Sequence, residues 1–123
     1  MRQPGISRDL LDLLLKIGKS QHPLEFLAIL RDHGGILDEL ELVPGTISGE
    51  ESASFSPHML PLRTGTTGSA HSHPNGVLEP SAADLRFFPS VGRFHIIVGA
   101  PYGADDWRCY TAGGQPCILE VIE

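Results

Sequence analysis

Residues 71–84 read HSHPNGVLEPSAAD, and they combine a strand-like segment, a turn and the start of a helix. Alternate residues of an extended chain point to the same side, so His71 and His73 are expected on one face of a strand. A proline and an Asn-Gly pair follow, which is typical of a strand end and a turn. Ser81 then begins a helix, and Asp84 lies one turn into it, from where its carboxylate can lean back toward the histidines.

These side chains suit a zinc ion. Zinc in proteins binds histidine nitrogen and carboxylate oxygen, and a catalytic site typically keeps three protein ligands and an open fourth position. The spacing predicts His71, His73 and Asp84 as ligands of one catalytic Zn²⁺. Two histidines two residues apart also occur on surface strands, and Ser81 with Asp84 fits a capping box that has Asp in place of Glu. A capped helix start is compatible with a metal site, because it holds both side chains rigidly.

The combination of HSHP, six further residues and then SxxD closely resembles the JAMM motif of the MPN+ metalloprotease family. That motif also includes an upstream glutamate in a segment resembling HPxEF, and residues 22–26 here read HPLEF. The resemblance covers almost the whole chain, because Gly68 and the segments 94–98 and 101–107 are similar to the small archaeal members. The one departure is Arg31-Asp32, near where many members carry a glycine, and it lies away from the motif residues.

The resemblance implies one domain over residues 1–123 with an α/β fold of the cytidine deaminase-like type, a curved mixed β-sheet flanked by helices. It implies that Glu25 is the general base on a zinc-bound water. The Ser81 hydroxyl would stabilise the oxyanion by donating a hydrogen bond. Zinc deaminase chemistry is not supported, because the sequence lacks HxE and PCxxC, and the HExxH pattern of other zinc proteases is absent too.

The resemblance also implies a substrate. Members of the family hydrolyse the isopeptide or peptide bond after the C-terminal Gly-Gly of ubiquitin-like proteins, and a compact archaeal-like chain suggests a desampylase-like enzyme. Two other functions stay open. One is a processing peptidase that trims a sulfur-carrier protein to expose its Gly-Gly end, and the other is a non-catalytic MPN scaffold module in a larger complex. Scaffold modules generally lack the metal residues, so the motif favours an enzyme.

The composition of the chain limits the classes of partner that we expect for it. A chain of 123 residues with 41% apolar residues fits one domain with a substantial core. The net charge of −6 and the lack of a basic run argue against nucleic acid as the main partner. The first residues lack an apolar signal core, and the leucine-rich run 10–15 is too short to span a bilayer, so we expect a cytoplasmic protein without a membrane partner. An exposed apolar face would suit a homodimer, which the sequence does not locate.

Hydrophobic patterning predicts alternating helices and strands. Ser7 is expected to cap a first helix that Gly18 and the segment 21–23 end, and a second helix is expected over 81–88. Strands are expected at 24–30, 36–43, 54–56, 69–73, 94–98, and at 107–110 and 117–122, the last two as a hairpin. Cys109 and Cys117 would lie opposite each other in that hairpin, where a disulfide is feasible but two reduced thiols are preferred in a cytosolic protein.

The remaining polar residues have structural interpretations. His22 is expected at the turn between the first helix and the next strand, His33 in a polar turn, and His95 as a hydrogen-bonded core residue rather than a ligand. Tyr102 is expected in the core, since large aromatic side chains dominate cores. The apolar neighbours of Glu25 indicate burial, which is costly for a carboxylate without a partner and favours its role beside a zinc-bound water.

Overall fold

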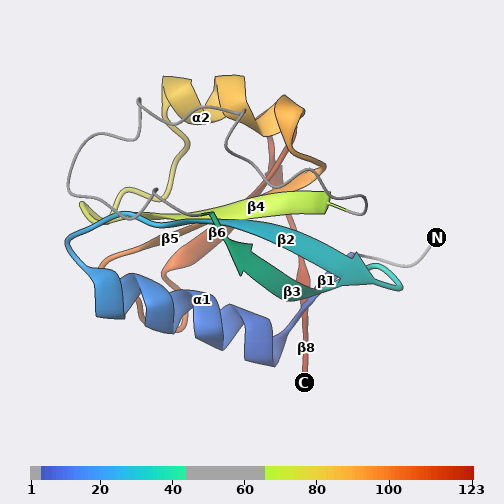
Figure 1. Ribbon diagram of the computed structural model, residues 1–123, viewed down its shortest axis with the longest axis horizontal. Helices are drawn as coiled ribbons and strands as arrows, with labels where there is room; N and C mark the ends of the chain where they lie inside the picture. Colours follow the sequence, from blue (N-terminus) through green and yellow to red (C-terminus); the bar gives the residue numbers. More distant parts are fainter. Residues whose placement is uncertain (1–3, 44–65) are drawn as a thin grey trace.

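The computed structural model of the protein describes residues 4–43 and 66–123 and has an α/β fold (Figure 1). In these ranges one mixed sheet has strand order β7-β6-β5-β4-β2-β3-β1-β8, with one α-helix on each face. The helices are α1 (Arg8–Gln21) and α2 (Ala82–Phe87), and a 3-10 turn (Phe88–Ser90) follows α2. The strands are β1 (Gly5–Ser7), β2 (Leu27–His33), β3 (Ile36–Leu42), β4 (Thr66–His73), β5 (Phe94–Gly99), β6 (Trp107–Thr111), β7 (Pro116–Cys117) and β8 (Glu120–Ile122).

The sheet mixes both strand directions around a parallel centre. β4 and β5 are parallel and are joined through α2, whereas β2 pairs antiparallel with both β3 and β4. β7 and β8 lie at opposite edges of the sheet, although only Ile118 and Leu119 separate them in the chain. The two edges can be this close in sequence only if the sheet curls strongly, which confirms the predicted curved mixed sheet.

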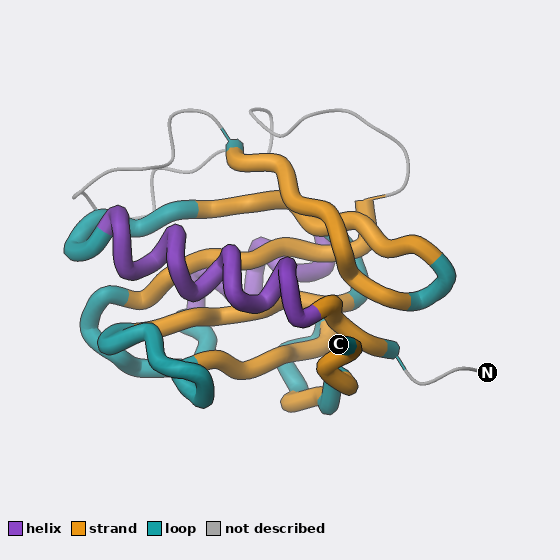
Figure 2. The backbone as a smooth tube through the Cα atoms, turned by 90° about the horizontal axis from the view of Figure 1, so that it is seen from below, coloured by secondary structure: helices purple, strands orange, loops and turns teal. Residues whose placement is uncertain are grey.

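Helix α1 is stabilised both by a capping residue at its start and by an apolar face that packs in the core. The Ser7 hydroxyl accepts a hydrogen bond from the Leu10 amide at 3.1 Å, which satisfies one of the free donors at the helix start. Leu10, Leu11, Leu14 and Leu15 are buried in the core, and each contributes about 1.5–3 kcal/mol. Figure 2 shows α1 lying across the strands of the sheet. Among residues 4–43 and 66–123, no helix is long and apolar enough to cross a membrane.

The helix ends where the segment 21–23 was predicted to end it, but the prediction that Gly18 helps to end it is wrong. Gly18 lies inside α1, where a Cβ atom would come within 2.6 Å of the Tyr102 ring. The lack of a side chain at Gly18 therefore makes room for an aromatic ring from a distant segment.

Different hydrophobic clusters cover the two faces of the sheet. Ala28 and Leu30 of β2 belong to the core cluster under α1, while Leu27 and Ile29 belong to a separate cluster on the opposite face. Leu27 is the antiparallel partner of His71, and directly paired residues project to the same side of a sheet. His71 and, by alternation, His73 therefore face α2.

Two strand predictions need correction, and a third is not tested. The strand predicted at 24–30 begins only at Leu27, because the Leu24 amide bonds the Gln21 carbonyl at 2.7 Å and closes a turn. The strand predicted at 117–122 is two separate strands in the structure. β7 pairs with β6, but Glu120 pairs with Gly5 of β1, a strand that was not predicted. The strand predicted at 54–56 lies outside the described residues.

The two cysteines lie opposite each other, as predicted. Cys109 of β6 and Cys117 of β7 are register partners, and their Sγ atoms are 2.7 Å apart as free thiols. The contact between the two sulfurs lowers the pKa of Cys117, whereas this contact and burial raise the pKa of Cys109.

Gly68 is the clearest backbone constraint on the central strands. A Cβ atom there would lie 1.6 Å from the carbonyl oxygen of Phe94, its partner on β5. We predict that Gly68→Ala lowers the free energy of unfolding by about 3 kcal/mol or more, because the backbone has no room to move. Gly113→Ala is the matched control, since its nearest neighbour would be 3.9 Å away, and it should change stability by less than about 0.5 kcal/mol. Urea denaturation of both variants checks this, and equal midpoints would contradict it.

Candidate metal centre

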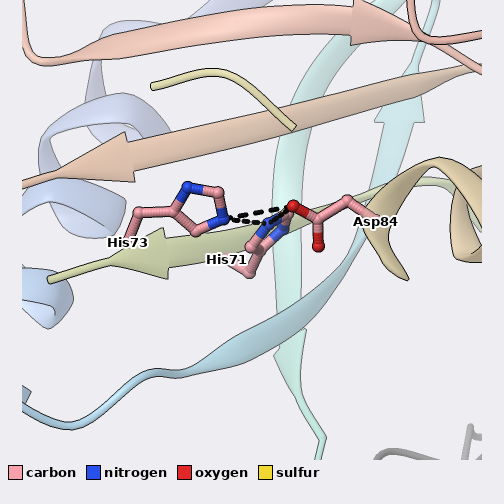
Figure 3. A group of neighbouring side chains, drawn as sticks. All are labelled: His71, His73 and Asp84. Carbon is pink, nitrogen blue, oxygen red and sulfur yellow. Dashed lines mark hydrogen bonds and ion pairs between the residues drawn. The ribbon is translucent and has the colours of Figure 1, made fainter. Parts of the chain in front are cut away.

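The structure brings His71, His73 and Asp84 together at the end of β4 (Figure 3). The Nε2 atoms of the two histidines are 3.1 Å apart, and Asp84 Oδ2 lies 3.1 Å from His73 Nε2 and 3.2 Å from His71 Nε2. A tetrahedral zinc ion with ligands at about 2.0–2.1 Å separates them by roughly 3.3–3.4 Å. The triangle of donor atoms therefore fits a zinc ion after a shift of a few tenths of an ångström.

The two imidazole rings are held by different means. His73 Nδ1 lies 2.7 Å from the Val77 carbonyl oxygen, which accepts its N–H and leaves the Nε2 lone pair for a metal. His71 is buried against the ring of Phe88 at a centroid distance of 6.3 Å, and its Nδ1 has no hydrogen-bond partner among the described residues. Packing therefore orients His71, whereas a hydrogen bond orients His73.

Asp84 is held by the capping box that the sequence predicted. The Ser81 hydroxyl oxygen accepts from the Asp84 amide at 3.1 Å, and Asp84 Oδ2 accepts from the Ser81 amide at 2.8 Å. The structural and functional interpretations of these residues are thus compatible. Because Ser81 uses an oxygen lone pair for the cap, its hydroxyl proton remains able to donate to another group.

The charges of the cluster suit a cation. Burial favours the neutral carboxyl of Asp84, but hydrogen bonds from His71 and His73 outweigh burial and hold its pKa below the usual range. Burial also opposes protonation of His73, yet the hydrogen bond to Asp84 and the charges of Asp84 and Glu25 raise its pKa overall. One carboxylate and two imidazole nitrogens form a donor set typical of zinc.

Glu25 lies beside this cluster without belonging to it. Glu25 comes two residues before Leu27, which pairs with His71, and the charge of Glu25 helps to raise the pKa of His73, so the carboxylate lies near the cluster. The intervening residues are tied together, since the Phe26 amide donates to Ser72 Oγ at 3.0 Å and the Ser72 amide to the Phe26 carbonyl at 3.3 Å. Sequence reasoning gave Ser72 no role, although a small hydroxyl residue between two ligands is a usable signal.

Residues 7–110 match a protein family described as prokaryotic homologues of the JAB domain. The chain belongs to this family. A probable metalloprotease from Haloferax volcanii is 40% identical over 129 residues, which cover 97% of this chain and 80% of that protein. The resemblance seen in the sequence is therefore confirmed.

Two solved structures extend the similarity of this JAB-domain protein to its fold. A JAB1/MPN domain protein from Archaeoglobus fulgidus is 38% identical with a TM-score of 0.80, covering 97% of this chain and 99% of that one. A structure described as a JAMM metalloprotease-like zinc site in the proteasome and signalosome is 37% identical with a TM-score of 0.78, covering 99% and 100%. This JAB-domain protein is thus a member of a JAMM-like zinc metalloprotease family with a His-His-Asp cluster.

A buried histidine packs behind the metal cluster through an aromatic ring. His95 of this JAB-domain protein is fully buried, and its ring nitrogens bond Ser69 Oγ at 2.7 Å and the Gly92 carbonyl at 2.8 Å. Its ring stacks on Phe88 at 4.1 Å, and Phe88 in turn contacts His71. The prediction that His95 is a hydrogen-bonded core residue is confirmed. Burial lowers its pKa to about 4.

We predict that the wild-type JAB-domain protein binds one zinc ion and that Asp84→Asn weakens binding at least about 100-fold. Loss of a residue that only supports a ligand already costs roughly 10–100-fold in metal affinity, and loss of a ligand should cost more. Asp38→Asn is the matched control, since Asp38 is an exposed residue of β3 that pairs with His33 at the end of β2. Equilibrium dialysis with measured zinc content checks this, and unchanged affinity in Asp84→Asn would remove Asp84 from the ligand set.

The lowered pKa of His95 predicts a pH-dependent stability. Between pH 6.5, the ordinary histidine value, and about 4, the unfolded state binds a proton that the folded state does not, so this contribution is complete above pH 6.5 and is lost as pH falls toward 4. The advantage of wild type over His95→Phe in free energy of unfolding should shrink by about 2 kcal/mol from pH 7.5 to pH 5. Denaturation followed by the fluorescence of Trp107, the single tryptophan, measures this. Parallel pH profiles of the two proteins would refute it.

Proposed function

We propose that the protein is a zinc-dependent isopeptidase that cleaves after the C-terminal Gly-Gly of a ubiquitin-like modifier, in the manner of a deubiquitinase or desampylase. The observation that carries the proposal is the position of Glu25. Its charge acts on His73, so its carboxylate lies near the metal cluster, but it stands outside the three-residue donor set. Such an arrangement supplies a base next to a metal without blocking the open position.

The roles of the side chains follow from their positions. A zinc ion held by His71, His73 and Asp84 would act as a Lewis acid on the scissile carbonyl and make water a stronger acid. Glu25 would take a proton from the attacking water and pass it to the leaving nitrogen. The carbon–nitrogen bond to the lysine breaks, the glycine gains a carboxylate, and the lysine leaves as an amine.

Ser81 would stabilise the negative charge that develops on the carbonyl oxygen. Ser81 is an exposed residue at the start of α2, and its hydroxyl oxygen already accepts the Asp84 amide. The hydroxyl proton is therefore the part of Ser81 left to act, which supports donation to an oxyanion rather than nucleophilic attack.

A Gly-Gly tail is consistent with a site of this kind, because glycine lets a peptide backbone approach closely. From the sequence we also expect the tail to add as a strand to the sheet near residues 52–56, a segment that lies outside the described residues. A cytoplasmic location and a homodimer also stay predictions. The sulfur-carrier peptidase would use the same chemistry on a peptide bond, whereas the assembled metal cluster disfavours a non-catalytic scaffold.

We predict that Glu25→Gln lowers kcat on a lysine-linked ubiquitin-like conjugate by about 10²–10⁴-fold, because the amide cannot accept the proton. Zinc content should stay at one equivalent, since Glu25 is outside the donor set. Glu79→Gln is the matched control: Glu79 is exposed in the loop before Ser81 and should leave kcat within about twofold.

The same assay separates the alternatives. Cleavage of a linear Gly-Gly extension but not of a lysine conjugate would favour the sulfur-carrier peptidase. Zinc-loaded protein that cleaves neither substrate would argue for the scaffold, and Glu25→Gln with wild-type kcat would disprove the base role.

A further inference from the structure

Tyr102 is held tightly in a loop that lies far in sequence from the metal ligands. It follows β5, its side chain is buried, and its ring occupies the space left by the missing Cβ of Gly18 in α1. Its backbone has φ +64°, a left-handed conformation that is uncommon for a residue other than glycine. Such a conformation persists only where the surroundings impose it, and it often marks a functional position.

The hydroxyl of Tyr102 reaches the end of α1. Its oxygen lies 3.2 Å from Nδ1 of His22, 80 residues away in the chain, and the two rings meet edge to face with centroids 5.7 Å apart. His22 is the C-terminal cap of α1, and its amide bonds the Gly18 carbonyl at 3.0 Å. Tyr102 thus contacts the last turn of α1 twice, through its ring at Gly18 and through its hydroxyl at His22.

The turn that begins at His22 leads directly to Glu25. The Leu24 amide bonds the Gln21 carbonyl at 2.7 Å, and the Phe26 amide bonds Ser72 Oγ at 3.0 Å. Glu25 therefore stands between a turn fixed at His22 and a contact fixed on β4. Burial and then the nearby charge of Glu25 raise the pKa of Tyr102, which indicates that the phenol and the carboxylate are close in space.

We propose that Tyr102, through its hydrogen bond to His22, is a positioning residue that fixes the turn presenting Glu25 to the metal centre. This inference rests on the proposed function, in which Glu25 is the base. Neither Tyr102 nor His22 touches the reacting atoms. Their effect is on where the carboxylate stands, so it should appear in kcat and not in substrate binding or zinc binding.

The test uses the zinc-loaded full chain with Tyr102→Phe, His22→Phe and the double variant. Each single variant removes the hydrogen bond and keeps an aromatic ring. We expect each to lower kcat about 3–10-fold, the effect of one hydrogen bond, with KM and zinc content unchanged. The double variant should lose little more than either single variant, because both substitutions remove the same interaction.

Hydrogen exchange gives a readout that needs no substrate. The Leu24 and Phe26 amides should exchange about 3–10-fold faster in Tyr102→Phe, while the amides of β4 and β5 keep their wild-type rates. Tyr110→Phe is the matched control, since it removes a phenol that donates to the Leu78 carbonyl at 2.8 Å, away from this turn. It should leave exchange at Leu24 and Phe26 unchanged.

The outcomes are distinct. Wild-type kcat or wild-type exchange at Leu24 and Phe26 in Tyr102→Phe would overturn the inference, as would effects of the two substitutions that multiply. Faster exchange throughout the sheet, together with loss of zinc, would show a general structural role and overturn it too. Glu25→Gln is measured in parallel: full activity in that variant identifies a failure of the proposed base, whereas an inactive Glu25→Gln beside a normal Tyr102→Phe identifies a failure of the positioning role alone.

Discussion

One oxygen atom of Asp84 connects the helix start to the metal ligands. Asp84 Oδ2 accepts the Ser81 amide at 2.8 Å and also lies within 3.2 Å of both imidazoles. Since α2 is part of the connection between the parallel strands β4 and β5, this atom sets how that connection sits on the sheet. The contacts that start the helix are therefore the contacts that assemble the donor set, and neither can shift without the other.

The ligands could be predicted from sequence because they are local. His71, His73 and Asp84 fall within one strand-turn-helix segment, and standard strand and capping geometry brings them together. Glu25 is different: its apolar neighbours indicate a buried carboxylate that needs a partner, and the family resemblance identified it as the base. Its place beside His73 depends on the pairing of β2 with β4, which is a long-range contact that local patterns do not encode.

Two of the errors in the prediction have the same origin. Gly18 was predicted to help end α1 because glycine favours helix ends. In the structure the ring of Tyr102 packs against Gly18 and leaves no room for a side chain there. The final hairpin was predicted from one symmetric turn, yet β8 leaves it to pair with β1. In each case a partner from the other end of the chain overrode a local preference. The family resemblance predicted the curved sheet correctly but did not supply these individual contacts.

The curl of the sheet also affects how the molecule meets other chains. Within the described residues the two outer strands are β7 and β8, which have two and three residues. A sheet edge presents unpaired amide and carbonyl groups that can recruit strands of other molecules, and short edges present few of them. Because both outer strands are short, this part of the protein has few unpaired backbone groups through which sheets of different molecules could pair edge to edge and aggregate.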